Sequence, residues 1–425
     1  MSLAAKPDRT KHSRTGENVR VAYGCSTMRG YRDQQEDRYA IHLELPVAGS
    51  SVQHENMFCG VYDGHRGSTM AEHVSNTLHV TLAASEAYQN RRYPEALDKS
   101  FRRMDQDVRD GKVVSDDVEE EDRNYPNPKG EPTASGCTAT VALLSGLQLT
   151  VANAGDSRAV LCRDGKATRL STDHSPYEPG ELRRIKAAGS TVVRGKVGMM
   201  LAMTRSLGDI GAKSNPKVSI DKQAILGSPD VTETRLTLED EFMVLATDGV
   251  WNSLLDRDKI GRTFLKELDA PALEAILARI GCLPEKVSKA AMVTKVDGLS
   301  KAEVRRAINP LNEEDQYTVY ASGEATSSQN VCDAVRWCIA QRLPLAKVCE
   351  CVLDFCFENF NGNDNMTIVV VAFLHGRSLK EWYTWVANRV RRAQGRKTRI
   401  FETFEPRPDS SMSLNQIVKQ ALQTV

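Results

Sequence analysis

Three aspartates, each beside a short apolar run typical of a buried strand, constrain the fold of this chain most strongly. The pairs are Asp63 with residues 57–62, Asp248 with residues 242–246 and Asp364 with residues 366–373. A sheet holds each strand end rigidly, and several converging carboxylates form an oxygen-rich site for hard divalent cations. Asp-Gly is also a common hairpin turn, which is our interpretation of Asp164-Gly165. Asp63 instead precedes a helical pattern, and Asp248 precedes Val250-Trp251.

Composition excludes several classes of protein. The 425 residues carry 56 Lys and Arg against 56 Asp and Glu, and this balance argues against general binding to nucleic acid or to a membrane surface. No apolar run is long enough to span a bilayer. The 10 cysteines include no Cys-x-x-Cys pair, so we expect buried free thiols rather than zinc ligands. A reducing compartment, the cytoplasm or the nucleus, is therefore expected.

The periodicity of the chain predicts mixed helices and strands. Apolar residues recur at helical spacing over 71–82 and 94–108, whereas residues 138–144, 147–153 and 159–163 alternate as strands separated by short turns. Short turns imply antiparallel neighbours, so an α+β sandwich is expected. Further strands are predicted at 199–202, 242–246 and 366–374. Residues 260–330 are rich in Ala, Lys and Glu and are predicted to be mostly helical.

The candidate metal ligands are all oxygen donors, which selects Mg²⁺ or Mn²⁺ over zinc or copper. They are Glu36, Asp37, Asp63, Asp248, Asp364 and Asp156. Gly64 leaves room for a carbonyl or a water beside the ion. His65 has the chemistry to donate a proton to a leaving group, although it is alternatively a structural imidazole. Arg32 has the geometry to grip an anionic oxygen, although it is alternatively an ordinary surface arginine.

These residues belong to a set of motifs that resembles the PPM family of metal-dependent serine/threonine protein phosphatases, the type 2C class. The matching stretches follow the family order over residues 21–374: Arg32-x-x-x-Glu36-Asp37, Val61-Tyr62-Asp63-Gly64-His65, Ser135-Gly136-Cys137-Thr138, Ala154-Gly155-Asp156-Ser157-Arg158, Asp173-His174-Ser175-Pro176, Thr204-Arg205-Ser206-Leu207-Gly208-Asp209, Ala246-Thr247-Asp248-Gly249-Val250-Trp251 and Asp364-Asn365-Met366. The resemblance implies a four-layer α/β/β/α sandwich of two antiparallel sheets flanked by helices, with a helical insertion before the last conserved strand.

The resemblance also implies a mechanism for phosphoprotein substrates. Asp63 would bridge two Mg²⁺ or Mn²⁺ ions, Asp248 and Asp364 would complete one, and Glu36 with the Gly64 carbonyl would serve the other, with Asp37 close by. A metal-bridging hydroxide would attack the phosphorus of phosphoserine or phosphothreonine, His65 would protonate the departing alkoxide, and Arg32 would hold the phosphate. Asp156 would contribute to a third, weaker site.

Two alternatives stay open at this point. A catalytically inactive relative would serve as a scaffold, but such relatives are expected to lose metal carboxylates, which this chain retains. Hydrolysis of nucleotides or other small phosphates would use the same site.

Two departures from the family pattern bear on the site. Arg66 stands where the family usually has Gly, and it adds positive charge. Asn252 stands where the family usually has Asp, so weaker binding of a third metal is expected.

The expected organisation is a flexible N-terminal arm (1–20), a phosphatase domain (21–375) with an insertion at about 260–330, and a basic C-terminal extension (376–425). The insertion and the basic tail are candidate docking segments for a partner, and a monomer is expected. Decoration is the alternative for the insertion, and a solvated helix packed by its tryptophans is the alternative for the tail.

Overall fold

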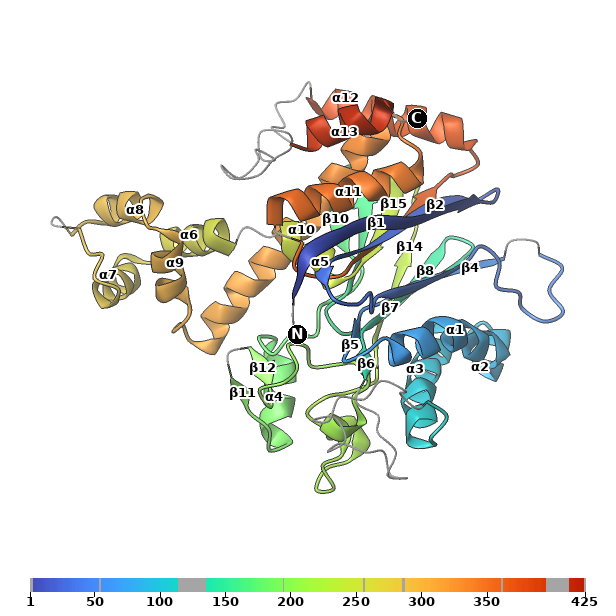
Figure 1. Cartoon of the computed structure of the whole chain (residues 1–425), viewed down its shortest axis with the longest axis horizontal. Coiled ribbons are helices and arrows are strands. Elements are labelled where there is room, and N and C mark those ends of the chain that lie inside the picture. Colours follow the sequence, from blue (N-terminus) through green and yellow to red (C-terminus); the bar gives the residue numbers. More distant parts are fainter. Residues whose placement is uncertain are drawn as a thin grey trace.

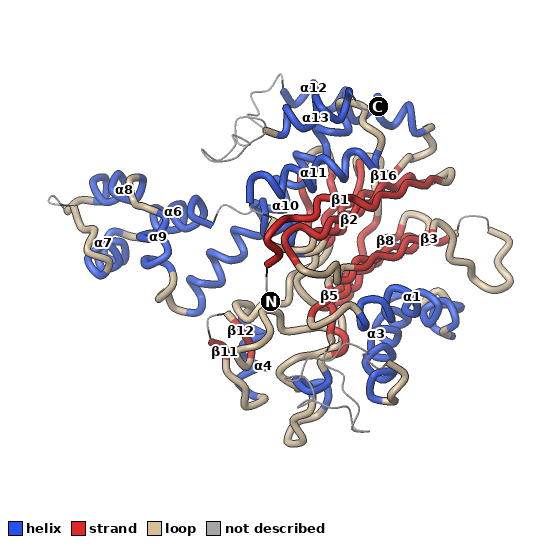
Figure 2. Tube along the Cα trace, viewed as in Figure 1, coloured by secondary structure: helices blue, strands red, loops and turns tan. Residues whose placement is uncertain are grey.

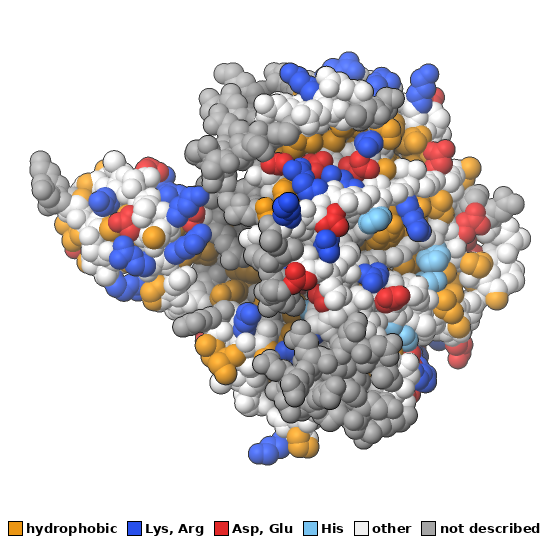
Figure 3. Space-filling view, viewed as in Figure 1, with side chains coloured by type: hydrophobic (Ala, Val, Ile, Leu, Met, Phe, Trp, Pro, Cys, Tyr) orange, Lys and Arg blue, Asp and Glu red, His pale blue; other side chains and the backbone are white. Residues whose placement is uncertain are grey.

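The computed structural model describes residues 3–52, 55–113, 135–193, 195–254, 257–284, 287–360, 362–394 and 413–423. Among these, no helix combines the length and the apolar character needed to cross a bilayer. The acidic run at 116–122 lies outside the described residues. Lys and Arg side chains are interspersed with Asp and Glu on the face shown in Figure 3, in keeping with the balanced charge.

Two antiparallel sheets form the centre of the molecule (Figures 1 and 2). The six-stranded sheet has the order β1 (Leu3–Glu17), β2 (Val21–Arg32), β16 (Met366–Phe373), β15 (Asp240–Ala246), β9 (Arg158–Arg163) and β10 (Lys166–Arg169). The five-stranded sheet has the order β14 (Asp230–Arg235), β8 (Gln148–Ala154), β7 (Ala139–Ser145), β4 (Asn56–Tyr62) and β3 (Arg38–His42). A small sheet of β13 (Leu207–Gly208), β6 (Gly136–Cys137) and β5 (Gly64–His65) lies beside them.

Helices cover the outer face of each sheet, which confirms the four-layer α+β sandwich. The helices α1 (Thr69–Ala84), α2 (Glu86–Gln89) and α3 (Tyr93–Arg109) pack on the five-stranded sheet, and α10 (Glu313–Ala340), α11 (Leu345–Phe360), α12 (Leu379–Gln394) and α13 (Leu414–Gln423) form the opposite outer layer. A third apolar cluster fills the space between the sheets. Strands β4, β15 and β16 are therefore buried on both faces, which explains their continuous apolar sequences.

The N-terminal segment corrects the expected flexible arm. Leu3–Glu17 forms the edge strand β1, which pairs with β2 from Leu3↔Arg32 to Glu17↔Ala22. Ion pairs tie it to α11, where Arg9 contacts Asp354 and Glu358. A polar, charged sequence is compatible with an edge strand as well as with a flexible arm. Composition therefore could not distinguish these two structures.

The insertion forms a helical lobe with its own apolar core. It contains α6 (Arg257–Glu267), α7 (Ala270–Arg279), α8 (Lys289–Asp297) and α9 (Lys301–Ile308), and α10 leads from it back onto the sandwich (Figure 1). Leu265, Leu273, Leu277 and Val304 are buried in the lobe. The Ser300 and Glu303 side chains form a reciprocal capping box that fixes the start of α9.

A small subdomain, residues 174–226, contains α4 (Pro179–Ala187), the hairpin β11 (Val192–Val193) and β12 (Lys196–Val197), and the 3₁₀ turns η2 (Ile210–Lys213) and η3 (Ile220–Lys222). Its apolar cluster is built from Ile185, Val197, Leu201 and Ile225. The strand predicted at 199–202 is wrong, because these residues form a turn in which only Leu201 makes a bridge, to Val197.

The C-terminal region belongs to the outer helical layer. Trp382 of α12 is fully buried, and its indole N–H donates to the Glu241 carbonyl at 3.1 Å. Arg389 is paired with Glu241 and Asp164. In the described part of the chain, the residues after 375 therefore pack on the catalytic domain and form no independent unit. This packing favours a helix held by its tryptophans over a free basic surface. Arg396, Lys397 and Arg399 lie outside the described residues.

Candidate metal centre and catalytic site

The sandwich brings the predicted carboxylates to one end of its two sheets. Asp63 follows β4, Asp248 begins the short helix α5 (Asp248–Trp251) after β15, and Asp364 precedes β16. Antiparallel pairing of β15 with β16 sets Ala246 opposite Ile368, which brings the Asp248 and Asp364 segments together at one end of the six-stranded sheet. Asp63 follows a strand of the other sheet, and the charges of Asp248 and Asp364 both act on it and raise its pKa. The convergence expected from the sequence is therefore present.

Burial and mutual repulsion dominate the electrostatics of this cluster. The pKa values of Asp63 and Asp248 lie well above the ordinary range because both groups are desolvated and face other carboxylates. Burial also raises the pKa of Asp364, and it raises that of Asp37 to about 7. Such a group of desolvated anions favours either protons or a cation.

The carboxylates also have protein partners. Asp364 Oδ1 is 2.8 Å from Arg32 Nη2, Asp248 Oδ2 accepts from Asn252 Nδ2 at 2.9 Å, and Glu36 Oε1 accepts from the Gly67 N–H at 2.6 Å. Within the described ranges, no three Asp, Glu, His or Cys side chains are drawn into a closed metal-binding set. Each of these carboxylates is instead held by its own protein neighbour.

Asp37, just before β3, links the end of β15 to the start of β16. Its Oδ2 accepts from Thr247 Oγ1 at 2.9 Å and from Thr367 Oγ1 at 2.8 Å, and the side chain is buried. Its Oδ1 is buried without a hydrogen-bond partner among the described residues. One oxygen thus has a structural role, and the other remains for a cation or a water.

Gly64 and Asn365 fix the backbone around Glu36. A Cβ on Gly64 would lie 2.4 Å from the Glu36 carbonyl oxygen, so only glycine fits there. Asn365 Oδ1 accepts from the Glu36 N–H at 2.8 Å, while its amide donates to the carbonyls of Arg29 and Gln34. Asn365 therefore connects the Asp364 segment to the Glu36 segment.

His65 is held by the carboxylate of Asp209, for which the sequence motifs indicated no catalytic role. Its Nε2 lies 2.8 Å from Asp209 Oδ2, which also accepts from Ser206 Oγ at 2.6 Å. Burial disfavours the imidazolium, but the charge of Asp209 outweighs burial and raises the pKa of His65. Asp209 has a left-handed backbone (φ 49°), a strained conformation typical of functional sites. The motif ending at Asp209 was visible in the sequence, but its contact with His65 was not.

Arg32 lies inside the site rather than on the free surface. Its Nε donates to the Asn363 carbonyl at 3.0 Å, and its guanidinium pairs with Asp364. The structure therefore brings Arg32 to the cluster, where it orients Asp364.

Asp156, the residue expected to contribute to a third site, interacts electrostatically with Asp63 and Asp364. It lies on the turn between β8 and β9, and its Oδ1 is buried without a hydrogen-bond partner among the described residues. Burial, together with the charge of Asp173, raises the pKa of Asp156 to about 6.

Asn252 and Arg66, the two departures from the family pattern, each have a visible effect on the site. Asn252 donates to Asp248 and offers no charge to a third ion. Arg66 has a φ of 57°, a left-handed conformation that explains why glycine suits this position.

The donor set fits Mg²⁺ or Mn²⁺. It consists of carboxylates with a glycine carbonyl close by, it is desolvated, and it has buried oxygens without hydrogen-bond partners at Asp37 and Asp156. Hard oxygen ligands suit these cations.

Comparisons with known proteins agree with this geometry. The family model for Protein phosphatase 2C matches residues 21–266, more than half of the chain. The chain belongs to the protein phosphatase 2C family. It is 31% identical over 399 residues to Protein phosphatase 2C homolog 2 of Hypocrea jecorina, covering 92% of this chain and 71% of the relative. It is 30% identical over 397 residues to Protein phosphatase 2C homolog 2 of Schizosaccharomyces pombe, covering 92% of this chain and 83% of the relative.

A solved phosphatase of *Toxoplasma gondii* shares the fold, with a TM-score of 0.55, 19% identity and coverage of 86% of this chain and 96% of that one. Membership in this family confirms the resemblance that the motifs indicated, and the shared fold confirms the expected sandwich. Protein phosphatase 2C enzymes are metal-dependent serine/threonine protein phosphatases, and the chain is an enzyme of this family.

Proposed function

We propose that this protein hydrolyses phosphoserine and phosphothreonine in proteins, using two Mg²⁺ or Mn²⁺ ions held among Glu36, Asp63, Asp248, Asp364 and the Gly64 carbonyl. The observation that carries the proposal is the convergence of desolvated carboxylates beside His65 and its Asp209 partner. When bound, the ions activate water and neutralise the charge of the phosphate.

The chain's own residues would then perform three tasks. Arg32 would exchange its contact with Asp364 for the phosphate oxygens, since a guanidinium suits both as a bidentate partner. Asp209 would stabilise the imidazolium of His65 through Nε2. His65 Nδ1, buried without a hydrogen-bond partner among the described residues, would be the nitrogen left to pass a proton to the departing alkoxide.

A phosphothreonine peptide tests this function. We expect phosphate release with Mn²⁺ or Mg²⁺, and its loss in EDTA and in Asp63→Asn. Asn keeps the size of the side chain and removes the charge that the ions require. Thermal unfolding with and without Mn²⁺ would show that the variant is folded. A folded wild-type chain that released no phosphate with either metal would favour the inactive scaffold instead.

Location and partners complete the proposal. All ten cysteines are free and buried, which supports residence in a reducing compartment, the cytoplasm or the nucleus. We propose that the chain acts as a monomer on phosphoproteins, and that the helical lobe rather than the packed C-terminal helix meets them.

A further inference from the structure

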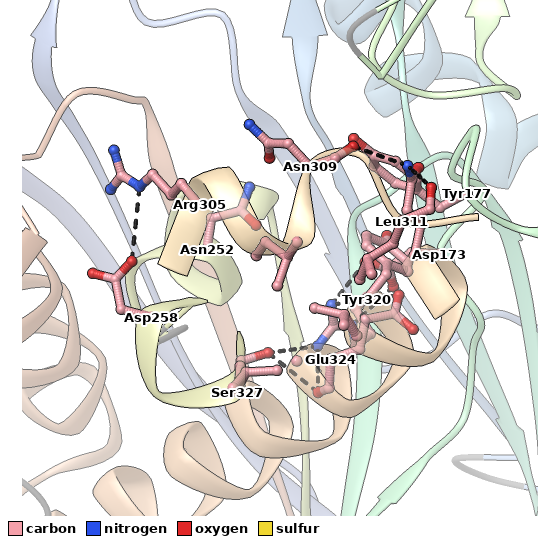
Figure 4. A pocket seen from close by; sticks show the side chains of 16 residues that line it. Asp173, Tyr177, Asn252, Asp258, Arg305, Asn309, Leu311, Tyr320, Glu324 and Ser327 are labelled. Atoms are coloured by element: carbon pink, nitrogen blue, oxygen red, sulfur yellow. Dashed lines mark hydrogen bonds and ion pairs between the residues drawn. The ribbon is translucent and has the colours of Figure 1, made fainter. Parts of the chain in front are cut away.

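A cavity of about 490 Å³ lies where α10 meets the lobe and the sandwich (Figure 4). Asn252 lines it and also donates to Asp248 Oδ2 at 2.9 Å, so one side chain joins the cavity wall to a proposed metal ligand. On the lobe side, Asp258 and Arg305 line the cavity, and Glu324 of α10 lies on the opposite side. The cavity therefore adjoins the catalytic site, and the insertion supplies much of its lining.

A buried arginine fixes this cavity to the catalytic domain. Arg158, which follows the Asp156 turn, is bidentate to Asp173 at 2.8 and 2.7 Å, and its Nη1 donates to the Glu324 carbonyl and to Ser327 Oγ on α10. Its guanidinium also lies 5.1 Å from the Trp251 ring centroid. These contacts hold α10 in a set position relative to the metal centre.

Two carboxylates in the cavity have an oxygen with no hydrogen bond. Glu324 is 5% exposed, and its Oε2 is 2.6 Å from Arg169 Nη1. Its Oε1 accepts no hydrogen bond from a described donor and lies 3.8 Å from Arg158 Nη2, an ion pair beyond hydrogen-bonding distance. Burial, together with the charge of Asp173, raises the pKa of Glu324 to about 7.

Asp258 is 9% exposed, and its Oδ1 also lacks a hydrogen bond. The exposed side chain of Arg305 stands 3.7 Å away, beyond hydrogen-bonding distance. The Arg305 guanidinium therefore forms a long ion pair with Asp258 but donates no hydrogen bond to Oδ1.

Aromatic rings and a second cavity extend the cleft. The ring centroids of Tyr177 and Tyr320 lie 5.6 Å apart. Aromatic faces pack against the aliphatic part of a lysine or arginine side chain and attract its charged end. An adjoining cavity of about 710 Å³ lies between the subdomain of residues 174–226 and α10, and it shares Tyr177, Asn309 and Gln316 with the first. Lys186 and Glu313 pair across it at 2.5 Å.

We propose that this cleft is a substrate subsite, in which Asp258 and Glu324 receive the side chain of a lysine or arginine near the phosphorylated residue. The inference rests on the proposed phosphatase function and names the substrate class of the same site. The adjoining cavity would accept the neighbouring residues of the peptide. Direct continuity with Asp248 through Asn252 favours a substrate over an independent small molecule.

The test measures kcat/KM for a set of phosphothreonine peptides in which one lysine is moved through each position from four residues before to four after the phosphothreonine. The reference peptide carries no basic residue. The wild-type chain should prefer lysine at one or two positions by about tenfold, the effect of one partly desolvated charge pair.

Three variants locate the preference. Asp258→Asn and Glu324→Gln should each reduce the ratio of kcat/KM for the best lysine peptide to that for the reference peptide by about tenfold. Arg305→Ala should raise this ratio, because it removes the competing guanidinium. Glu274→Gln, an exposed change on α7 of the same lobe, serves as the matched control and should leave the ratio unchanged.

The possible results distinguish a failure of the proposed subsite from a failure of the proposed phosphatase function. A wild-type chain that hydrolyses every peptide equally overturns the subsite and leaves the phosphatase function intact. A wild-type chain that hydrolyses none overturns both. Variants that keep the wild-type ratio but unfold at lower temperature would show that the carboxylates are structural only, which also overturns the subsite.

Discussion

Asp209→Asn is the substitution that best tests the role of the His65 proton. His65 Nε2 lies 2.8 Å from Asp209 Oδ2, and the two side chains are 11% and 1% exposed. At an effective dielectric constant of about 20, opposite charges at that distance attract by about 6 kcal/mol. Burial of both groups offsets part of this attraction. If about 2 kcal/mol remains, the imidazolium is favoured roughly 30-fold.

Asparagine has the shape of aspartate, so its contact with Ser206 is preserved while the charge is lost. Burial, together with the charge of Arg66, would then lower the pKa of His65, opposed only by the charge of Glu36. We expect kcat for a phosphothreonine peptide to fall by about 10- to 100-fold at pH 7, less than the roughly 100- to 10,000-fold that a general acid contributes, because the imidazole itself stays in place.

The assay compares two leaving groups. A threonine alkoxide needs a proton to depart, whereas p-nitrophenolate is a weak base that leaves without one, so kcat for p-nitrophenyl phosphate should fall much less. Asp240→Asn is the matched control, because it removes the buried charge that pairs with Arg163 (2.7 Å) at the opposite end of β15 from Asp248. Equal losses on both substrates in Asp209→Asn would refute the role of Asp209 in proton transfer.

Three further predictions concern charge and backbone. Relative to the wild type, Glu324→Gln should gain stability as the pH rises from about 4.5 to about 7, by up to about 3 kcal/mol. The reason is that the folded wild-type chain keeps the Glu324 proton over a pH range in which the unfolded chain has released it. A difference in the free energy of urea unfolding that is constant between pH 4 and pH 8 would contradict this. Asn252→Asp should lower the melting temperature in EDTA, since it faces Asp248, and should increase the stabilisation by Mn²⁺, measured by titration against the wild type. Arg66→Gly should raise the free energy of unfolding by about 0.5–1 kcal/mol by relieving a left-handed backbone; an unchanged or lower unfolding midpoint would argue against strain.

The sequence predicted those parts of the molecule that depend on local pattern and on motif order. The helix over residues 94–108 follows from its apolar spacing, and Leu97, Phe101, Met104 and Val108 are indeed buried. Strands β15 and β16 follow from unbroken apolar runs. The convergence of Asp63, Asp248 and Asp364 follows from strand ends that a sandwich must bring together.

The contacts that support the site could not be predicted in the same way. Asp37 meets Thr247 and Thr367, which are 210 and 330 residues away in the sequence, and His65 meets Asp209, which is 144 residues away. Each is a single hydrogen bond between common polar residues, so no local periodicity marks it. Only the register of strands drawn from distant parts of the chain decides which threonine faces which aspartate.

The insertion shows most clearly how tertiary packing gives a segment its place. Its composition predicted helices but gave no reason for them to lie beside the metal centre. Arg158 supplies that reason, since it binds Asp173 within the catalytic domain and the Glu324 carbonyl, Ser327 Oγ and Ser328 Oγ on α10. Removing one partner of a buried ion pair is costly, so α10 cannot leave Arg158 without exposing or stranding that charge. The insertion is thereby kept at the rim of the catalytic site, where its carboxylates are in position to select substrates.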